Sequence, residues 1–371
     1  MTDLFDSEED FHGKDRKQFR KERRQLQESD RSKYKKTNVV KKVELEISKD
    51  ALRGRVVAVT GEGIWVDSPP SGRFLCMLKG LLKKEKMQVK NLIAVGDYVW
   101  FEPTGKMSGS IARIEERTSV LGRTDLSGTK QQLIAVNVDQ IFIVVSVVEP
   151  PLKPALVDRY LIAAAKGHLH PIIVVNKIDL LPESGEEAER YKAFLAAYEP
   201  LGVPILTLSS KEGSGIDAFK FLMKDRTSVV AGQSGVGKST LLNRAFQLQQ
   251  KTGELTTKTS KGAHTTSRAE LIALPDGGYC IDTPGVRSFG LWQLEREDVQ
   301  DHFQEIREIG EKCRFSNCTH VFEPNCAVLE GLKKGLISQM RYESYCSLLG
   351  EALGEEDHWT KRKMETPDGS D

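Results

Sequence analysis

The chain has 371 residues, 39% of them hydrophobic, which is enough for two or three globular domains with ordinary cores. Its 54 Lys and Arg nearly balance 53 Asp and Glu, so the formal net charge of +1 says little about partners. No apolar run reaches the ~18 residues of a membrane span, and the acidic start matches neither a signal peptide nor a transit peptide. We therefore expect a cytoplasmic protein without a membrane partner.

Residues 1–48 are predicted to be a disordered basic tail. Between Lys14 and Lys42 there are 13 Lys and Arg against four Asp and Glu, with almost no aliphatic residues. Such a segment buries too little apolar surface to offset its ordering entropy. It is either a solvated tail or a basic arm that lies on RNA phosphates, and composition favours neither interpretation.

Residues 49–118 have the pattern of a small β-barrel of the OB-fold type. Short strands separated by glycine turns are predicted at residues 53–60, 64–66, 74–78, 97–101 and 109–114. A basic patch accompanies them at Lys79, Lys83, Lys84, Lys86 and Lys90. Aromatic residues lie near it at Trp65, Tyr98, Trp100 and Phe101. RNA-binding barrels use this mixture, although for any single ring we favour burial in the barrel core.

From about residue 140, buried strands alternate with helices, which predicts an α/β domain over residues 119–290. The continuous apolar run at 141–148 is typical of a central parallel strand. Further strands are expected at 171–175, 204–208, 228–231, 270–274 and 278–282. Helices are expected at 156–166, 188–198 and 241–246.

Within this domain, residues 232–240 match the phosphate-binding loop pattern G-x-x-x-x-G-K-[ST]. Glycines let backbone N–H groups approach a polyphosphate, Lys238 offers a charge to the β- and γ-phosphates, and the Ser239 hydroxyl can ligate Mg²⁺. The loop would lie at a helix N-terminus, where the helix dipole favours anions. The predicted nucleotide-binding residues are Gly232, Gln233, Ser234, Gly235, Val236, Gly237, Lys238, Ser239 and Thr240.

A guanine-recognition motif follows another buried strand, at Asn176, Lys177, Ile178 and Asp179. The Asp179 carboxylate can accept two hydrogen bonds from guanine, whereas adenine offers no such pair of donors. After the next strand come Ser209, Ser210 and Lys211, which we expect to complete the base site.

The switch residues are expected between the phosphate loop and the end of the sheet. Asp282 would hold Mg²⁺ through water, and the N–H of Gly285 would meet the γ-phosphate. Thr266, with Thr265 as the alternative, would complete the Mg²⁺ shell. Val286 stands where many GTPases carry a water-positioning Gln, so intrinsic hydrolysis should be slow. The candidate catalytic residues are His264, Thr266 and Lys238, with a structural role as the alternative for His264.

The order of these motifs is unusual, because guanine recognition precedes the phosphate loop, whereas it comes last in ordinary GTPases. This order indicates a circular permutation, which compact domains tolerate because their termini tend to lie close together. The DxxG motif at 282–285 then leads directly into the C-terminal domain, so that γ-phosphate contacts could be transmitted there.

The C-terminal domain, residues 291–371, carries a candidate metal centre at Cys313, Cys318, His320 and Cys326. Three thiolates and one imidazole suit a closed, tetrahedral, structural Zn²⁺ site, and no open position for a catalytic metal is implied. The other three cysteines are isolated and expected in cores. A helical stretch is predicted at 329–349, followed by a polar tail.

Together these motifs resemble the ribosome small subunit-dependent GTPase A family of bacteria. The resemblance covers residues 50–350 and rests on the barrel, the segments 176–179, 232–240, 262–266 and 282–285, and the Cys-Cys-His-Cys knuckle. It implies an OB-fold barrel, a circularly permuted GTPase domain and a zinc domain. It further implies late maturation of the small ribosomal subunit, with GTP hydrolysis stimulated by that subunit. We expect GTP or GDP, Mg²⁺ and one structural Zn²⁺ as cofactors, and a monomer that binds the subunit and its rRNA.

Two other functions fit the same motifs. An RNA-binding assembly factor could use its nucleotide site only to sense GTP, and a translation factor could act on complete ribosomes. The rate of GTP turnover with and without ribosomal subunits distinguishes the first alternative from a subunit-stimulated GTPase. Co-sedimentation with isolated small subunits or with complete ribosomes distinguishes the second.

Overall fold

The computed structural model describes residues 48–79, 92–124, 131–248, 269–282 and 294–354. In this part of the chain, no helix combines the length and apolarity needed to cross a bilayer. The predicted tail at 1–48 falls outside it apart from its last residue. Other predicted residues outside it are Lys83, Lys84, Lys86, Lys90, His264, Thr265, Thr266, Gly285 and Val286.

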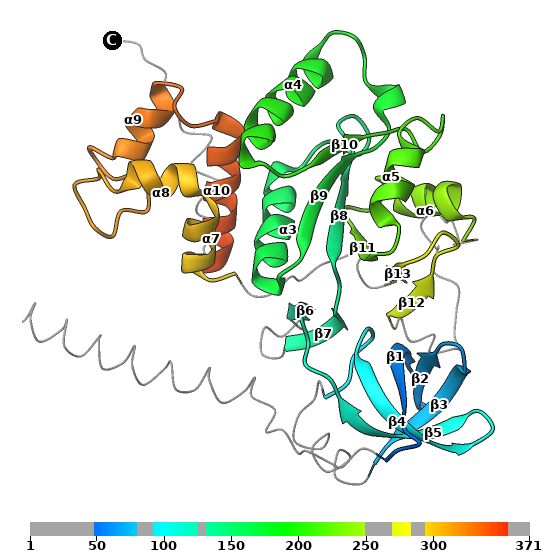
Figure 1. The fold of residues 1–371 in the computed structure, drawn as a ribbon. Helices are drawn as coiled ribbons and strands as arrows, with labels where there is room; N and C mark the ends of the chain where they lie inside the picture. The colour runs from blue at the N-terminus through cyan, green and yellow to red at the C-terminus, as the bar shows by residue number, and fades with distance from the viewer. Residues whose placement is uncertain (1–47, 80–91, 125–130, 249–268, 283–293, 355–371) are drawn as a thin grey trace, which may run out of the picture. The chain divides into compact units, whose positions relative to one another are not determined.

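The first strands close into a five-strand barrel, as predicted (Figure 1). They are β1 (Leu52–Val59), β2 (Ile64–Ser68), β3 (Gly72–Leu78), β4 (Tyr98–Gly105) and β5 (Ser108–Ile114). The ladder runs β1-β2-β3-β5-β4, and β4 pairs back onto β1. Closure leaves no unpaired edge and turns alternate side chains inward, where Val56, Val66, Phe101 and Ile111 form the core.

The four aromatic residues that the sequence analysis named, Trp65, Tyr98, Trp100 and Phe101, are engaged with protein groups. Phe101 is fully buried in the barrel core, as we expected for any single ring of this group. Trp65 packs against the core of the α/β domain. The guanidinium of Arg53 lies 4.5 Å from the ring centre of Tyr98, and the indole N–H of Trp100 donates to Glu115.

A hairpin of β6 (Val120–Thr124) and β7 (Gln131–Val136) leads into the α/β sheet. The sheet contains β8 (Gln140–Val145), β9 (His170–Val175), β10 (Ile205–Thr207), β11 (Thr227–Ala231), β12 (Glu270–Ala273) and β13 (Tyr279–Asp282). Their spatial order is β10-β9-β8-β11-β13-β12, parallel except for β12. Period-two alternation along β8 sends Ile141 and Ile143 to one face and Phe142 and Val144 to the other.

Helices cover both faces of this sheet, so the predicted α/β class is confirmed (Figure 1). The helices are α3 (Pro154–Gly167), α4 (Glu186–Tyr198), α5 (Ile216–Met223) and α6 (Lys238–Phe246), with 3-10 turns η1 (Ile178–Leu180) and η2 (Glu199–Leu201). One core contains residues of α3 and α4, and the other contains residues of α5 and α6.

The C-terminal region is helical, but its last helix differs from the prediction. It comprises α7 (Arg296–His302), α8 (Gln304–Gly310), α9 (Ala327–Lys333) and α10 (Gln339–Leu353). The single helix predicted at 329–349 is wrong, because the chain turns between α9 and α10. Gly335 adopts a φ of 70°, and the N–H of Leu336 bonds back to the carbonyl of Gly331, which is a helix-ending turn.

Arg55 of β1 connects the barrel to the sheet. Its side chain is buried and donates to the Thr227 hydroxyl and the Asn137 carbonyl, both at 2.8 Å. Burial lowers the pKa of this guanidinium, although the Tyr98 and Tyr279 rings beside it act in the opposite direction. A buried cation is stable only when its donors are satisfied, so these acceptors hold the barrel and the sheet together.

We predict that Arg55→Met lowers the free energy of unfolding by about 1–3 kcal/mol, because buried acceptors lose their donor. Chemical denaturation of the full chain measures this change. Arg53→Met is the matched control, since its pair with Glu115 is half exposed and should contribute about 1 kcal/mol or less. Equal losses from both variants would contradict a connecting role for Arg55.

Candidate nucleotide site and metal centre

The predicted nucleotide-site segments converge at the carboxyl ends of the parallel strands. Strands β8 and β11 are neighbours at the centre of the sheet. The chain passes from β8 to β9 on one side of this pair, and β13 pairs with β11 on the other side. Such a switch point leaves a crevice where open α/β sheets bind ligands. A hollow lies there, lined by Val145, Ser146, Pro151, Lys153, Leu156, Gln233 and Val236.

The phosphate loop connects β11 to α6 with a turn that requires glycine. Gly232 has a φ of 140°, and a Cβ there would lie 2.1 Å from the carbonyl oxygen of Val144. Gly237 has a φ of 91°, and a Cβ there would lie 2.5 Å from Nδ2 of Asn176. The backbone can therefore pack this closely only without side chains, which leaves its N–H groups available to an anion.

Lys238 begins α6, and its ammonium is held by the loop itself. Nζ donates to the carbonyl oxygens of Gly232 and Gln233, both at 2.7 Å. The positive charge thus lies across the mouth of the loop, next to a helix N-terminus that also favours anions. Ser239 follows in the first turn of α6, as expected for a hydroxyl that ligates Mg²⁺ beside the phosphates.

Asn176 joins the base-recognition segments to the phosphate loop. Its side chain is buried at the end of β9 and donates through Nδ2 to the carbonyl of Val236 at 2.7 Å. Its Oδ1 accepts from the N–H of Ser210 at 3.0 Å and from its own neighbour Lys177 at 2.8 Å. One amide therefore orders three loops that are distant in sequence.

Asp179 lies in η1, next to the loop that follows β10. The Ser209 hydroxyl donates to Asp179 Oδ1 at 2.5 Å, which orients the carboxylate. Lys177 adopts a φ of 63°, and its Nζ donates to the carbonyl of Glu149 at 2.8 Å. Lys211, the residue after Ser210, is exposed. The structure thus brings together the predicted residues of the base site, whereas of the predicted switch it gives only Asp282, as the last residue of β13.

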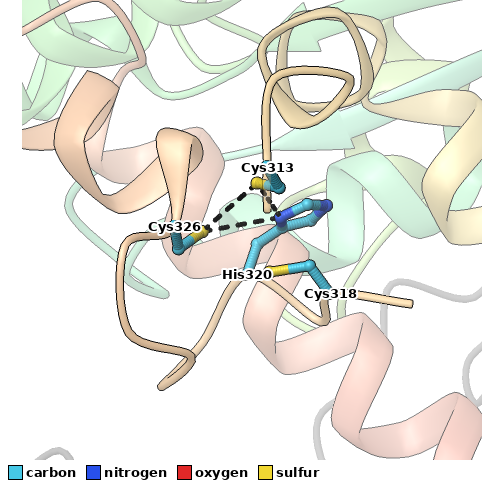
Figure 2. A group of neighbouring side chains, drawn as sticks. All are labelled: Cys313, Cys318, His320 and Cys326. Atoms are coloured by element: carbon cyan, nitrogen blue, oxygen red, sulfur yellow. Dashed lines mark hydrogen bonds between the residues drawn. The ribbon is translucent and has the colours of Figure 1, made fainter. Parts of the chain in front are cut away.

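The side chains of Cys313, Cys318, His320 and Cys326 converge on one point, as Figure 2 shows, and their ligand atoms all lie within 4.8 Å of one another. The Sγ atoms of Cys313 and Cys326 are 3.8 Å apart, and they lie 3.5 Å and 3.6 Å from Nδ1 of His320. A tetrahedral Zn²⁺ with ordinary bond lengths separates two ligand sulfurs by about 3.8 Å and a sulfur and a nitrogen by about 3.5 Å. The cluster therefore fits zinc.

Protonation of the cluster and metal binding are linked. Burial lowers the pKa of His320, which keeps its imidazole in the neutral, ligating form. Burial raises the pKa of the Cys318 thiol to about 12, so a thiolate there needs a compensating cation.

Backbone contacts fix the loop that carries these ligands. The hydroxyls of Tyr342 and Tyr345 on α10 donate to the carbonyls of His320 and Thr319. The Glu323 carboxylate accepts from the N–H and hydroxyl of Thr319 at 2.6 and 2.7 Å. Burial would raise the pKa of Glu323, but these hydrogen bonds outweigh it and lower the pKa to about 2. The carboxylate therefore stays ionised and keeps the loop folded at neutral pH.

Sequence motifs did not identify every residue that supports the two sites. They missed Glu149, Glu323 and Tyr160, which is buried in the same core as Ala231, the residue before the phosphate loop. Glu149 acts through its carbonyl, which carries no signature in the sequence. Tyr160 lies in a helix whose apolar residues are ordinary for a core, and only its polar tip hints at a partner.

Sheet order, phosphate loop and motif order define the class of protein, which is a circularly permuted P-loop GTPase. The family model described as RsgA GTPase matches residues 114–292. The chain is similar to the small ribosomal subunit biogenesis GTPase RsgA of Chlorobaculum parvum, with 41% identity over 310 residues, 81% of this chain and 98% of that protein. It is also similar to RsgA 2 of Bacteroides thetaiotaomicron, with 36% identity over 80% of this chain and 96% of that protein.

Solved structures agree with this assignment. YjeQ from Thermotoga maritima superposes with a TM-score of 0.64 at 34% identity, covering 82% of this chain and 99% of that one. YloQ, described as a circularly permuted GTPase, gives 0.60 at 28% identity, with 86% and 97% covered. The chain belongs to the RsgA GTPase family and is a GTP hydrolase, so the resemblance predicted from the sequence is confirmed.

We predict that Asp179→Asn weakens GTP binding by about 100-fold or more, because two hydrogen bonds to a charged acceptor are lost. Xanthosine nucleotides should bind the variant better than GTP, since the donor and acceptor pattern inverts. Titration calorimetry measures both affinities. Asp217→Asn, an exposed carboxylate at the start of α5, is the control. Equal affinity of the unaltered chain for ATP and GTP would contradict this assignment.

We predict one Zn²⁺ per chain, which elemental analysis of the purified protein measures. Chelation should unfold the C-terminal helices, because metal binding supplies folding free energy to such small domains. Cys326→Ser should lose the metal, whereas Cys346→Ser, a cysteine of α10 outside the cluster, should retain it. A metal-free chain with an intact C-terminal fold would rule out the structural role.

Proposed function

We propose that this GTPase binds the small ribosomal subunit, assists its late maturation and hydrolyses GTP in response to it. The observation that carries the proposal is the joint presence, in one chain, of a barrel, a permuted GTPase domain and a Cys3His cluster. The relatives named for small ribosomal subunit biogenesis match over nearly their whole length, flanking regions included.

Finer features belong to the same proposal. The chain contacts rRNA as a monomer in the cytoplasm, and its functional divisions lie near residues 48, 118 and 290. The barrel at 49–118 and the zinc domain at 291–371 supply RNA contacts, and the basic tail adds phosphate contacts. Lys79 and Glu102 form an ion pair at the surface. Such pairs are weak, so an RNA phosphate can replace Glu102 as the partner of Lys79.

In this proposal each predicted site residue has a role in nucleotide binding. The N–H groups of the loop at 232–237 and the Lys238 ammonium bind the β- and γ-phosphates, while Asp179 accepts the guanine donors. Asn176 keeps these two halves in register through Val236 and Ser210. Ser239, Thr266 and Asp282 would hold Mg²⁺, which neutralises charge developing on the phosphate oxygens.

Hydrolysis then requires a water molecule aligned with the γ-phosphorus. Water attacks, the bond to the β–γ bridging oxygen breaks, and GDP and phosphate leave. Lys238 stabilises the charge on the leaving oxygens, and His264 orients the water, because Val286 has no group that can do so. Without the small subunit, turnover is slow.

We predict that purified small subunits raise the rate of GTP hydrolysis by about 10³-fold or more, the range for GTPases completed by a partner. The stimulation should fall steeply with added salt, because phosphate contacts release counterions. Phosphate release, measured while subunits are titrated, tests both expectations.

Two variants complete this experiment. Lys238→Ala should abolish basal and stimulated turnover, whereas His264→Ala should reduce turnover and leave GTP affinity unchanged. Complete ribosomes serve as the competing activator. Fast turnover by the isolated protein that subunits do not change would refute the proposed coupling.

A further inference from the structure

Helix α3 lies between two hydrophobic cores. Val157, Leu161 and Ala164 belong to the core beneath the sheet. Ile162, the residue after Leu161, belongs instead to the core of the C-terminal helices, and α7 and α10 pack against α3 (Figure 1). The helix is therefore the surface on which the C-terminal helices dock onto the GTPase domain.

A buried ion pair fixes α10 to this surface. Asp158 of α3 is fully buried and bonded to Arg341 of α10, which is itself 1% exposed. The carboxylate also accepts from the Tyr198 hydroxyl at 2.6 Å, and it lies 3.1 Å from Nε2 of His302. Arg341 reaches on to Glu305 of α8 at 2.7 Å. Because both charges are shielded from water, removal of one partner strongly disfavours the docked state.

Two more ion pairs join the same elements. Arg159 pairs with Glu351 near the end of α10, and Lys166 pairs with Asp298 of α7 at 2.6 Å. These pairs are partly exposed, so each contributes less than the buried one. Together the charged contacts extend from the second turn of α3 to its last.

The core that receives Ile162 also receives the cysteines of the metal cluster. Cys318 and Cys326 are buried in it, and Cys313 packs against it. The aliphatic side chain from α3 and the sulfur ligands therefore belong to one closely packed unit. A cavity on the α3 side of this core alters the packing around the ligands.

Helix α10 also holds the loop that carries the metal ligands. The Tyr342 hydroxyl donates to the carbonyl of His320 at 2.9 Å, and the Tyr345 hydroxyl donates to the carbonyl of Thr319 at 3.1 Å. Tyr342 is the residue after Arg341, so the ion pair to α3 and the hydrogen bond to a metal ligand come from adjacent residues. A displacement of α10 at one contact therefore moves the other.

Helix α8 provides a second connection. It carries Glu305, the other partner of Arg341, and ends at Gly310. A Cβ at Gly310 would lie 2.9 Å from Cε1 and Nε2 of His320, so the backbone of α8 closely approaches the imidazole. Arg341 is therefore linked to His320 through both α8 and α10.

We propose that α3 positions the zinc centre through the contacts of Asp158 and Ile162 with the C-terminal helices. Zinc binding and docking of these helices on the GTPase domain are linked, so each stabilises the other. Asp158 and Ile162 are positioning residues, which act on the ligands through α10 and the shared core. The inference uses the zinc centre predicted above and goes beyond the proposed function, since it needs no ribosomal subunit.

The alternative is a self-contained zinc knuckle, whose affinity depends only on residues 313–326. The contacts favour linkage, because carbonyls within the ligand loop are bonded by α10 and α10 is held by α3. Without Asp158, Arg341 loses one of its two carboxylates, so α10 is held less firmly against the ligand loop. A self-contained knuckle would keep its zinc affinity when α3 is altered.

The test measures zinc affinity of the full chain by competition with a chromophoric chelator. Ile162→Ala opens a cavity in the shared core, and Asp158→Asn removes a charged partner of Arg341. Each should weaken zinc binding by about fivefold or more, the lower end for coupled sites. Leu161→Ala is the matched control, because Leu161 has the same size as Ile162 but packs beneath the sheet. It should destabilise the GTPase domain and leave zinc affinity unchanged.

A milder variant keeps the test decisive if either change prevents folding. Ile162→Val removes one methyl group from the shared core and should weaken zinc binding by about twofold. Arg307→Met is the control within the C-terminal domain, since Arg307 pairs with Asp301 on an exposed surface. It should leave zinc affinity unchanged.

Hydrogen exchange supplies the reciprocal readout. Zinc should slow amide exchange in α3 of the unaltered chain, and Ile162→Ala should reduce this protection. Folded variants at Asp158 and Ile162 with unchanged zinc affinity, an equal loss in Leu161→Ala, or exchange in α3 that ignores zinc would each overturn the proposal. A chain that binds no zinc would overturn it as well.

Discussion

The nucleotide site depends on one buried amide. Asn176 donates to the carbonyl of Val236 and accepts from the N–H of Ser210, so it fixes the phosphate loop and the base loops against each other. Only an amide side chain offers a donor and an acceptor at this spacing without bringing a charge into the core. Gly237 must be glycine for the same reason, because a Cβ would collide with that amide. Guanine recognition and phosphate binding are therefore one packed unit.

This unit explains why the permuted chain order is compatible with the fold. Strands pair with their neighbours in space, and β11 pairs with β8 and β13 irrespective of which is made first. The contacts of Asn176 likewise join segments 60 and 34 residues apart. What permutation changes is the position of the ends. The barrel precedes β8, and the C-terminal helices follow β13, so both flanking regions attach directly to elements of the site.

The sequence predicted those features that short patterns encode. Apolar runs located the central strands, glycine spacing located the phosphate loop, and four ligand residues within a short span located the metal cluster. It did not predict the break between α9 and α10 at Gly335, since isolated glycines inside a helical pattern are tolerated. It could not predict the pair of Asp158 and Arg341, because a contact across 183 residues leaves no local signal.

The two flanking regions are attached by different physics. Arg55 of the barrel bonds to neutral acceptors at the amino ends of the strands, away from the nucleotide. Arg341 instead joins a buried carboxylate on α3, a helix whose Leu156 lines the same hollow as Gln233 and Val236 of the phosphate loop. Separation of the barrel leaves one buried cation without its acceptors, whereas separation of Arg341 from Asp158 leaves two opposite buried charges unpaired. The contact of the C-terminal helices is therefore the more costly of the two to break.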